Sequence, residues 1–168
     1  MLFIENIMAL LEKFEIPYFN LLKQKNRDVD LDLVFVEGAI TTATEIQELK
    51  EIRNRSKVLV AMGACACYGG VPAMRNFVES SALRKYVYYK ADHPEAVPVS
   101  GIGMHVNVDY YMRGCPIIKT EFVEFIESFL QGKIMEPFQG SVCKQCPRGP
   151  NCFLRSKVEC LGAATHGG

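Results

Sequence analysis

Two apolar, β-rich runs separated by one amphipathic segment constrain the fold of this chain most. The first run is Leu31–Val36, apolar except for Asp32, and the second is Lys57–Met62. Between them, Thr44–Arg53 places aliphatic side chains on one helical face and charged side chains on the other. A strand, a helix and a second strand of these lengths form a parallel βαβ unit. The sequence therefore predicts an α/β fold built on a parallel sheet.

Other segments extend this pattern. Met1–Glu15 and Lys119–Leu130 repeat apolar residues at helical spacing, so both are expected to be helices, and His105–Tyr111 alternates as a strand does. Pro72–Lys90 is expected to be helical in part. Ala91–Gly103 holds prolines and glycines, which predict an irregular loop.

The composition changes after the last predicted helix. Residues 1–134 carry the aliphatic periodicity of an α/β domain, whereas residues 135–168 are rich in Cys, Gly and Pro and poor in aliphatic side chains. The second segment cannot build much core of its own and needs another source of stability. We therefore divide the chain into an α/β domain, 1–134, and a cysteine-rich segment, 135–168.

Charge and hydropathy exclude several classes of protein. The chain has 19 basic and 19 acidic residues, so no strong field attracts nucleic acid. Its longest apolar runs are far shorter than the roughly 20 residues that span a bilayer. The first residues lack the basic region and the small-residue cleavage site of a secretory signal. We expect neither a nucleic-acid partner nor a membrane span.

Cys65 and Cys115 each follow a predicted parallel strand in a glycine-containing turn. Such turns cluster at the carboxyl edge of an open α/β sheet, where ligands bind. The two cysteines could therefore meet in space, and glycines beside them permit close approach to a bulky ligand. The alternative is a pair of buried structural thiols. Cys67 is expected not to be a ligand if Cys65 is one.

The remaining cysteines form a group in the second segment. The chain has seven cysteines, an odd number that leaves one unpaired in any disulfide scheme. Four of them are spaced C-x2-C-x5-C-x7-C within eighteen residues: Cys143, Cys146, Cys152 and Cys160. This stepped spacing favours an iron–sulfur cube, which needs four thiolates. A structural zinc site is the alternative, although such sites usually pair two short knuckles.

Glu37 and the three histidines are the other residues considered for a functional role. Glu37 ends the first predicted strand, where a carboxylate could have a raised pKa and relay protons. The alternative, which we favour, is a charge at a helix entry or an acceptor for loop amides. The three histidines, His93, His105 and His166, are expected to be surface or structural residues.

Four motifs together resemble a known family. They are VEGAI at Val36–Ile40, GACACYGGVPA at Gly63–Ala73, RGCPI at Arg113–Ile117 and the cysteine run Cys143–Gly162. In this order they resemble the small, electron-transferring subunit of nickel–iron hydrogenases. The resemblance covers nearly the whole chain and is closest to the cytoplasmic forms, namely the sulfhydrogenase delta-type and deazaflavin-reducing gamma-type subunits.

The resemblance implies a flavodoxin-like domain, with helices on both faces of its parallel sheet, and a small irregular iron–sulfur tail. Cys65 and Cys115 match two of the four ligands of the family's proximal 4Fe–4S cluster. The tail cysteines, Cys143, Cys146, Cys152 and Cys160, match the ligands of its distal-type cluster. The periplasmic and membrane-bound enzymes have a histidine at the position of Cys143, so the cysteine favours a cytoplasmic location.

The resemblance also implies partners. The nickel–iron centre that splits or forms hydrogen lies in a separate large subunit, so no catalytic residue is expected in this chain and Glu37 would at most line a proton route. A second partner would accept electrons through flavin, NAD(P), deazaflavin or another group. The family's remaining proximal cysteines precede its first helix, and its tail carries further cysteines. We therefore expect a chain truncated at both ends that binds the tail cluster and not a stable proximal one.

Two alternatives stay open. One is the 20 kDa-type cluster subunit of an NADH:quinone oxidoreductase-like complex, which shares the two glycine–cysteine turns but normally lacks the tail quartet. The other is a zinc-stapled α/β module without redox chemistry, which predicts zinc and a colourless protein.

Overall fold

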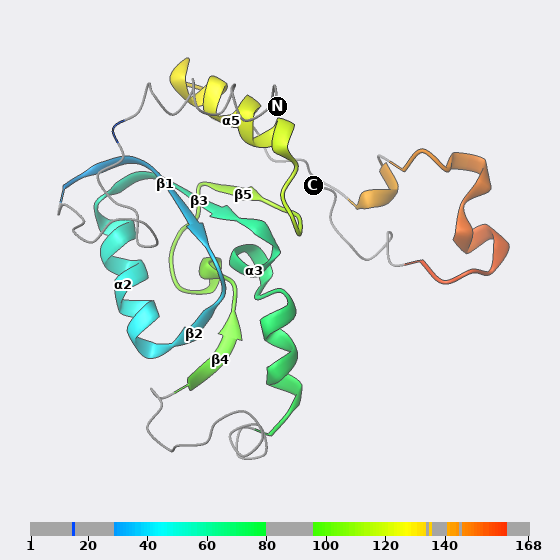
Figure 1. Ribbon diagram of the computed structural model, residues 1–168, viewed down its shortest axis with the longest axis horizontal. Coiled ribbons are helices and arrows are strands. Elements are labelled where there is room, and N and C mark those ends of the chain that lie inside the picture. The colour runs from blue at the N-terminus through cyan, green and yellow to red at the C-terminus, as the bar shows by residue number, and fades with distance from the viewer. Residues whose placement is uncertain are drawn as a thin grey trace.

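The computed structural model describes residues 15, 29–79, 96–133, 135, 141–144 and 146–160. Three strands form a parallel sheet in the order β1-β3-β5 (Figure 1). The strands are β1 (Leu31–Glu37), β3 (Ser56–Met62) and β5 (Tyr110–Met112), and a second, two-stranded sheet pairs β2 (Ile40–Thr42) with β4 (Ala96–Ser100). The helices are α2 (Ala43–Asn54), α3 (Gly63–Tyr68) and α5 (Lys119–Leu130), with 3-10 helices η1 (Val71–Phe77), η2 (Ile102–Met104), η3 (Val142–Lys144), η4 (Gly149–Asn151) and η5 (Phe153–Ser156). The predicted α/β fold is confirmed.

Helices cover both faces of the parallel sheet. Successive side chains of a strand point to opposite faces. On one face, Leu59 of β3 packs in a cluster with Leu49 of α2. On the other face, Val60 of β3 packs with Phe125 of α5. Figure 1 shows α2 and α5 on opposite sides of the sheet. The central strand β3 therefore contributes to two cores.

A capping box starts α2. The Thr42 hydroxyl accepts a hydrogen bond from the Glu45 amide at 3.3 Å, and Glu45 Oε2 accepts from the Thr42 amide at 3.0 Å. Glu45 Oε2 also accepts from the Thr41 amide at 2.7 Å. These bonds satisfy donors that a helix start otherwise leaves free. They place α2 immediately after β2.

Aromatic packing holds α5 against the sheet. The Phe125 ring lies 4.6 Å from the Tyr110 ring and 6.0 Å from the Phe35 ring, between centroids. The Tyr110 hydroxyl donates to Glu121 Oε1 at 2.9 Å. The pKa of Tyr110 is raised, first by burial and then by this bond to Glu121. The predicted helix over Lys119–Leu130 is confirmed with the same bounds.

Two sequence predictions between β3 and α5 are wrong in part. The segment Ala91–Gly103, expected to be a loop, contains β4, which forms because it pairs antiparallel with β2. The expected strand His105–Tyr111 is extended only from Tyr110. The His105 amide donates to the Ile102 carbonyl at 3.0 Å, which turns the chain before the strand begins.

Other predictions fall partly or wholly outside the described residues. The expected helix Met1–Glu15 does so except for its last residue. Of Pro72–Lys90, the described part contains most of η1, so its partial helicity is confirmed there as a 3-10 helix. None of the described helices has the length and apolar character needed to cross a membrane. The described part of the cysteine-rich segment forms the short 3-10 helices η3, η4 and η5, which Figure 1 draws apart from the sheet.

Candidate metal centre

Two cysteine-bearing segments meet at the carboxyl edge of the parallel sheet. α3 begins directly where β3 ends and carries Cys65, while Cys115 follows β5 after two residues. The Ala64 amide donates to the Gly114 carbonyl at 2.8 Å, so the residues that precede the two cysteines are hydrogen-bonded to each other. Cys65 thus lies in a short helix, where a turn was expected, but the two segments do lie side by side.

Both thiols of this pair are accessible. Cys65 is half-buried and Cys115 is exposed, and each is a free thiol. A Cβ atom at Gly70 would lie 2.8 Å from Cys65 Sγ, so only glycine allows the backbone to come this close to the thiol. Gly114 has a φ of +124°, which favours glycine as well. Glycine at these positions shapes the surroundings of both cysteines.

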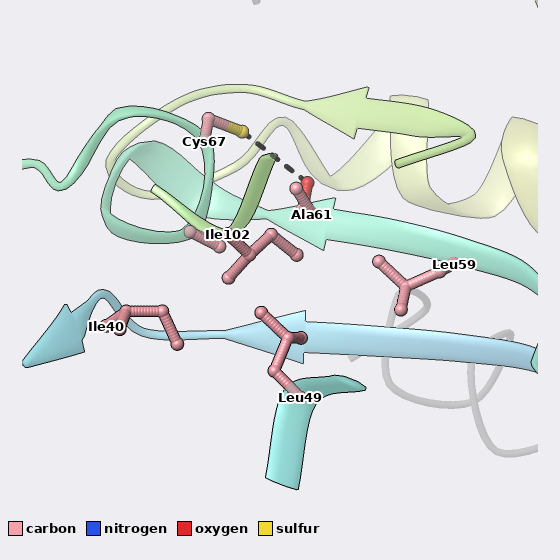
Figure 2. Close-up of a cluster of buried hydrophobic side chains, with 7 residues drawn as sticks. Ile40, Leu49, Leu59, Ala61, Cys67 and Ile102 are labelled. Atoms are coloured by element: carbon pink, nitrogen blue, oxygen red, sulfur yellow. Dashed lines mark hydrogen bonds between the residues drawn. The ribbon is translucent and has the colours of Figure 1, made fainter. Parts of the chain in front are cut away.

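Cys67, two residues after Cys65, is buried, and Figure 2 shows its thiol directed at the Ala61 carbonyl. Its Sγ atom lies 3.5 Å from the Ala61 carbonyl oxygen and 3.6 Å from the Met112 carbonyl oxygen. Burial raises the pKa of Cys67 to about 11, although the positive charge of Arg113 opposes the shift. Its burial and its two carbonyl contacts suit a structural thiol, and the expectation that Cys67 is not a ligand if Cys65 is one stays a prediction.

Arg113 and Tyr68 form a polar pair at the same edge that sequence reasoning did not assign. The guanidinium carbon of Arg113 lies 6.0 Å from the centroid of the Tyr68 ring. Burial raises the pKa of Tyr68, and the charge of Arg113 opposes that shift. Their adjacency to the cysteine motifs was the available signal. The pair places one positive charge beside the segments that carry Cys65 and Cys115.

Glu37 is exposed at the sheet edge, whereas the His105 side chain contacts a neighbouring hydroxyl group. Glu37 is exposed at the end of β1, and its backbone partner across the sheet is Met62, so it lies at the edge where the cysteine segments meet. Its role in a proton route stays a prediction. His105 Nε2 lies 2.8 Å from the Ser100 hydroxyl, which agrees with a structural role. His93 and His166 lie outside the described residues.

The tail thiols are dispersed along η3 to η5. Cys143, Cys146 and Cys160 are exposed and Cys152 is half-buried. Within the described ranges, no three cysteine, histidine or acidic side chains gather closely enough to hold a metal ion. The four thiols still supply the number and type of donors that an iron–sulfur cube needs. Coordination would therefore require the segment to close around the metal.

The 3-10 helix η1 has an exposed apolar face and lies next to the segment that carries Cys65. Residues three apart share one side of a 3-10 helix. Val71, Met74 and Phe77 are spaced in this way, and Phe77 is 91% exposed. The polar residues between them point to the protein: Arg75 donates to the Val97 carbonyl at 2.7 Å, and Asn76 donates to the Val99 carbonyl at 2.7 Å. The helix is anchored by polar side chains and presents apolar ones.

Comparison with known proteins shows that this chain is similar to subunits of redox complexes. Residues 3–129 match the family model described as NADH ubiquinone oxidoreductase, 20 Kd subunit. Sulfhydrogenase 2 subunit delta of Pyrococcus furiosus is 29% identical over 98% of this chain and 70% of its own length. A subunit of the vhu F420-non-reducing hydrogenase of Methanocaldococcus jannaschii is 28% identical over 98% of this chain and 68% of its own length.

The fold agrees with a solved structure. One chain in the crystal structure of an NAD+-reducing [NiFe]-hydrogenase in the H2-reduced state superposes with a TM-score of 0.69 and 28% identity. The match covers 79% of this chain and 83% of that chain. The named relatives are subunits of oxidoreductase complexes. They confirm the prediction that this chain is such a subunit, and they confirm the resemblance to hydrogenase small subunits on which that prediction rested.

Proposed function

The chain belongs to the family of the 20 kDa subunit of NADH ubiquinone oxidoreductase, and from this premise we propose that it is an electron-transfer subunit of a cytoplasmic nickel–iron hydrogenase. The observation that carries the proposal is the meeting of the Cys65 and Cys115 segments through the Ala64–Gly114 hydrogen bond. This places two accessible thiols at the sheet edge where α/β proteins bind ligands.

Iron–sulfur clusters would supply one-electron chemistry when bound to this chain. Cys143, Cys146, Cys152 and Cys160 would hold one 4Fe–4S cluster, because they offer four thiolates in a segment with little core. Cys65 and Cys115 would provide two ligands of a second cluster. Arg113, beside them, would favour the more reduced and hence more negative state of a cluster at that edge. The nickel–iron centre would lie in a partner.

Two observations favour a hydrogenase over an NADH:quinone oxidoreductase-like complex. The description of the family model names the second class. The cysteine quartet is a feature that the second class normally lacks, and the relatives that match 98% of this chain are named hydrogenase subunits. The hydrogenase is therefore the better candidate.

The exposed apolar face of η1 supports a partner subunit. Val71, Met74 and Phe77 are each more than half exposed in this chain. Interfaces of permanent complexes are rich in such side chains at their centre. Because η1 follows Gly70, which borders Cys65, a hydrogenase large subunit docked there would sit next to the paired thiols. An electron-accepting subunit would complete the complex.

Metal analysis of the 168-residue chain tests the proposal. After anaerobic purification and reconstitution, we expect about four irons and as much acid-labile sulfide per chain, held by the tail quartet. A Cys146→Ser variant should lose most of this iron. Ser156→Ala, also in the tail, should keep it, because Ser156 is an exposed residue without a thiol.

Two other outcomes of the metal analysis would contradict parts of the proposal. About eight irons would show that Cys65 and Cys115 take part in a complete second cluster, against the prediction of no stable proximal cluster. Roughly one zinc without sulfide would overturn the electron-transfer proposal in favour of a zinc-stapled module.

A further inference from the structure

The buried thiol of Cys67 is not used by the proposed function, yet it lies between the two strands that lead to the paired cysteines. β3 and β5 pair over only three residue positions, from Val60↔Tyr110 to Met62↔Met112. Cys67 Sγ reaches a carbonyl oxygen on each strand, at 3.5 Å on Ala61 and 3.6 Å on Met112. The thiol therefore contacts both strands within the last two of their three paired positions.

We propose that Cys67 is a positioning residue that sets the spacing between Cys65 and Cys115. Its single S–H proton is shared between the Ala61 carbonyl of β3 and the Met112 carbonyl of β5, and the Ala64–Gly114 hydrogen bond then joins the segments beyond the strands. Together, the Cys67 thiol and the Ala64–Gly114 hydrogen bond hold the thiols of Cys65 and Cys115 at one separation. The inference deepens the proposed function and rests on it only in treating Cys65 and Cys115 as a metal-binding pair.

The packing around Cys67 keeps its thiol in place. A Cβ atom at Gly101 would lie only 2.5 Å from the Cys67 carbonyl oxygen, so the backbone of α3 is held tightly against this loop. Cys67 also belongs to the core cluster that contains Leu59 and Ile102, and Figure 2 shows Ile102 next to it. The thiol cannot swing away without opening this core, so it bonds to the same carbonyls whenever the domain is folded.

Substitutions of Cys67 separate hydrogen bonding from other roles. Serine keeps a donor of similar size at this position, whereas alanine removes the donor and leaves both carbonyls without it. If the thiol acts by donation, serine should preserve the separation of Cys65 and Cys115 and alanine should not. If Cys67 were instead a ligand, serine would fail as alanine does.

A dithiol probe measures the separation directly. In the full chain with Cys143, Cys146, Cys152 and Cys160 replaced by Ser, phenylarsine oxide should bind Cys65 and Cys115, forming two As–S bonds and releasing one water. A Cys115→Ala variant of this background should lose that two-point binding. We expect Cys67→Ala to bind the arsenical about tenfold more weakly, because the effective concentration of the second thiol falls, and Cys67→Ser to match the parent.

Ile102→Val is the matched control. Ile102 is fully buried in the same cluster but bears no hydrogen bond between the strands. This variant should lower the thermal stability and leave the arsenical affinity unchanged. Equal affinity in Cys67→Ala and the parent, or equal weakness in Cys67→Ala and Cys67→Ser, would overturn the proposal. So would a parent that fails to bind one equivalent of the probe.

A second measurement applies if Cys67→Ala does not fold. With Cys65 and Cys115 alkylated in the same background, Cys67 is the remaining thiol, and its S–H stretching band in the Raman spectrum should lie below that of a free thiol. A band at the free position would overturn the proposal. Neither experiment uses iron or hydrogen, so failure here is distinct from failure of the metal analysis.

Discussion

At the scale of single residues, one carboxylate joins β3 to the segment that enters β5. Asp109 Oδ2 accepts from the Leu59 amide at 2.8 Å and from Arg53 Nη1 at 2.5 Å. Arg53 also donates through Nη2 to the Ser56 carbonyl at 2.8 Å. This network lies at the end of the sheet away from the cysteines. It helps to fix the position of β5, which has few residues of its own to do so.

Removing this carboxylate should destabilise the domain. We expect Asp109→Ala to lower the free energy of unfolding by about 1.5–3 kcal/mol, because a charged group bonded to a buried strand amide is lost. The exposed pair of Lys57 and Asp32, with side chains 75% and 73% exposed, is the control. Asp32→Ala should cost much less, because solvent screens this pair. Urea unfolding of both variants tests this, and equal losses would contradict it.

At the scale of elements, the capping box makes the start of α2 sensitive to one hydroxyl. Thr42→Ala removes the acceptor for the Glu45 amide and should cost about 1 kcal/mol of stability. Thr44→Ala, an exposed position in the first turn of the same helix, is the matched control and should cost little. Thermal unfolding of the two variants compares them. Alanine is a better helix former than threonine, so a loss at Thr44 as large as that at Thr42 would contradict the assignment of the effect to the capping hydroxyl.

The same box should make stability depend on pH. Partial burial of Glu45 raises its pKa, but hydrogen bonds from Thr41 and Thr42 outweigh this and lower it below the ordinary 4.5. A carboxyl with a lowered pKa stabilises the fold above its unfolded value, and this contribution is lost as the pH falls through the folded value. The stability difference between the parent and Glu45→Gln should therefore be larger at pH 7 than at pH 3. A difference independent of pH would show that the charge of Glu45 is not used.

The sequence predicted elements that rest on local pattern and missed those that rest on pairing. β1, β3, α2 and α5 were found within about two residues, because apolar runs and helical periodicity are local signals. β4 was missed because the prolines and glycines of Ala91–Gly103 indicated a loop, and Pro98 lies within the strand. The proline is exposed, and a strand of this kind tolerates it where no amide is needed. β2 has only three residues and forms through its pairing with β4.

The candidate site, too, was predictable only where it depends on local pattern and topology. The meeting of the Cys65 and Cys115 segments follows from parallel topology, since strand ends of this kind share one edge. The contacts of Cys67 depend on how α3 packs against Gly101, and spacing along the chain does not encode that. The arrangement of the tail thiols was out of reach for another reason. Metal binding and ordering of such a segment are one process, so the sequence alone carries no preformed site.

At the scale of the whole molecule, the two proposed metal-binding regions lie on different kinds of structure. The paired thiols lie on a packed sheet with two cores, where the backbone sets their positions. The tail thiols lie in and between short 3-10 helices and three of the four are exposed, so the metal itself would have to organise the ligands. Loss of metal should therefore loosen the tail and leave the sheet domain folded. Hydrogen exchange before and after chelation would show this, and unfolding of β3 on chelation would contradict it.

The apolar face of η1 should join the sheet domain to its partner. Phe77 is 91% exposed, so Phe77→Asp should leave the fold intact while placing a charge in the centre of the docking surface. If the proposed docking surface is correct, the dissociation constant for the hydrogenase large subunit should rise about tenfold or more, as when an interface loses an aromatic anchor. Leu130→Asp is the control: Leu130 is 45% exposed but ends α5, which covers the other face of the sheet. Affinity measured on the co-expressed subunits should fall in the first variant alone, and equal affinities in both would place the interface elsewhere.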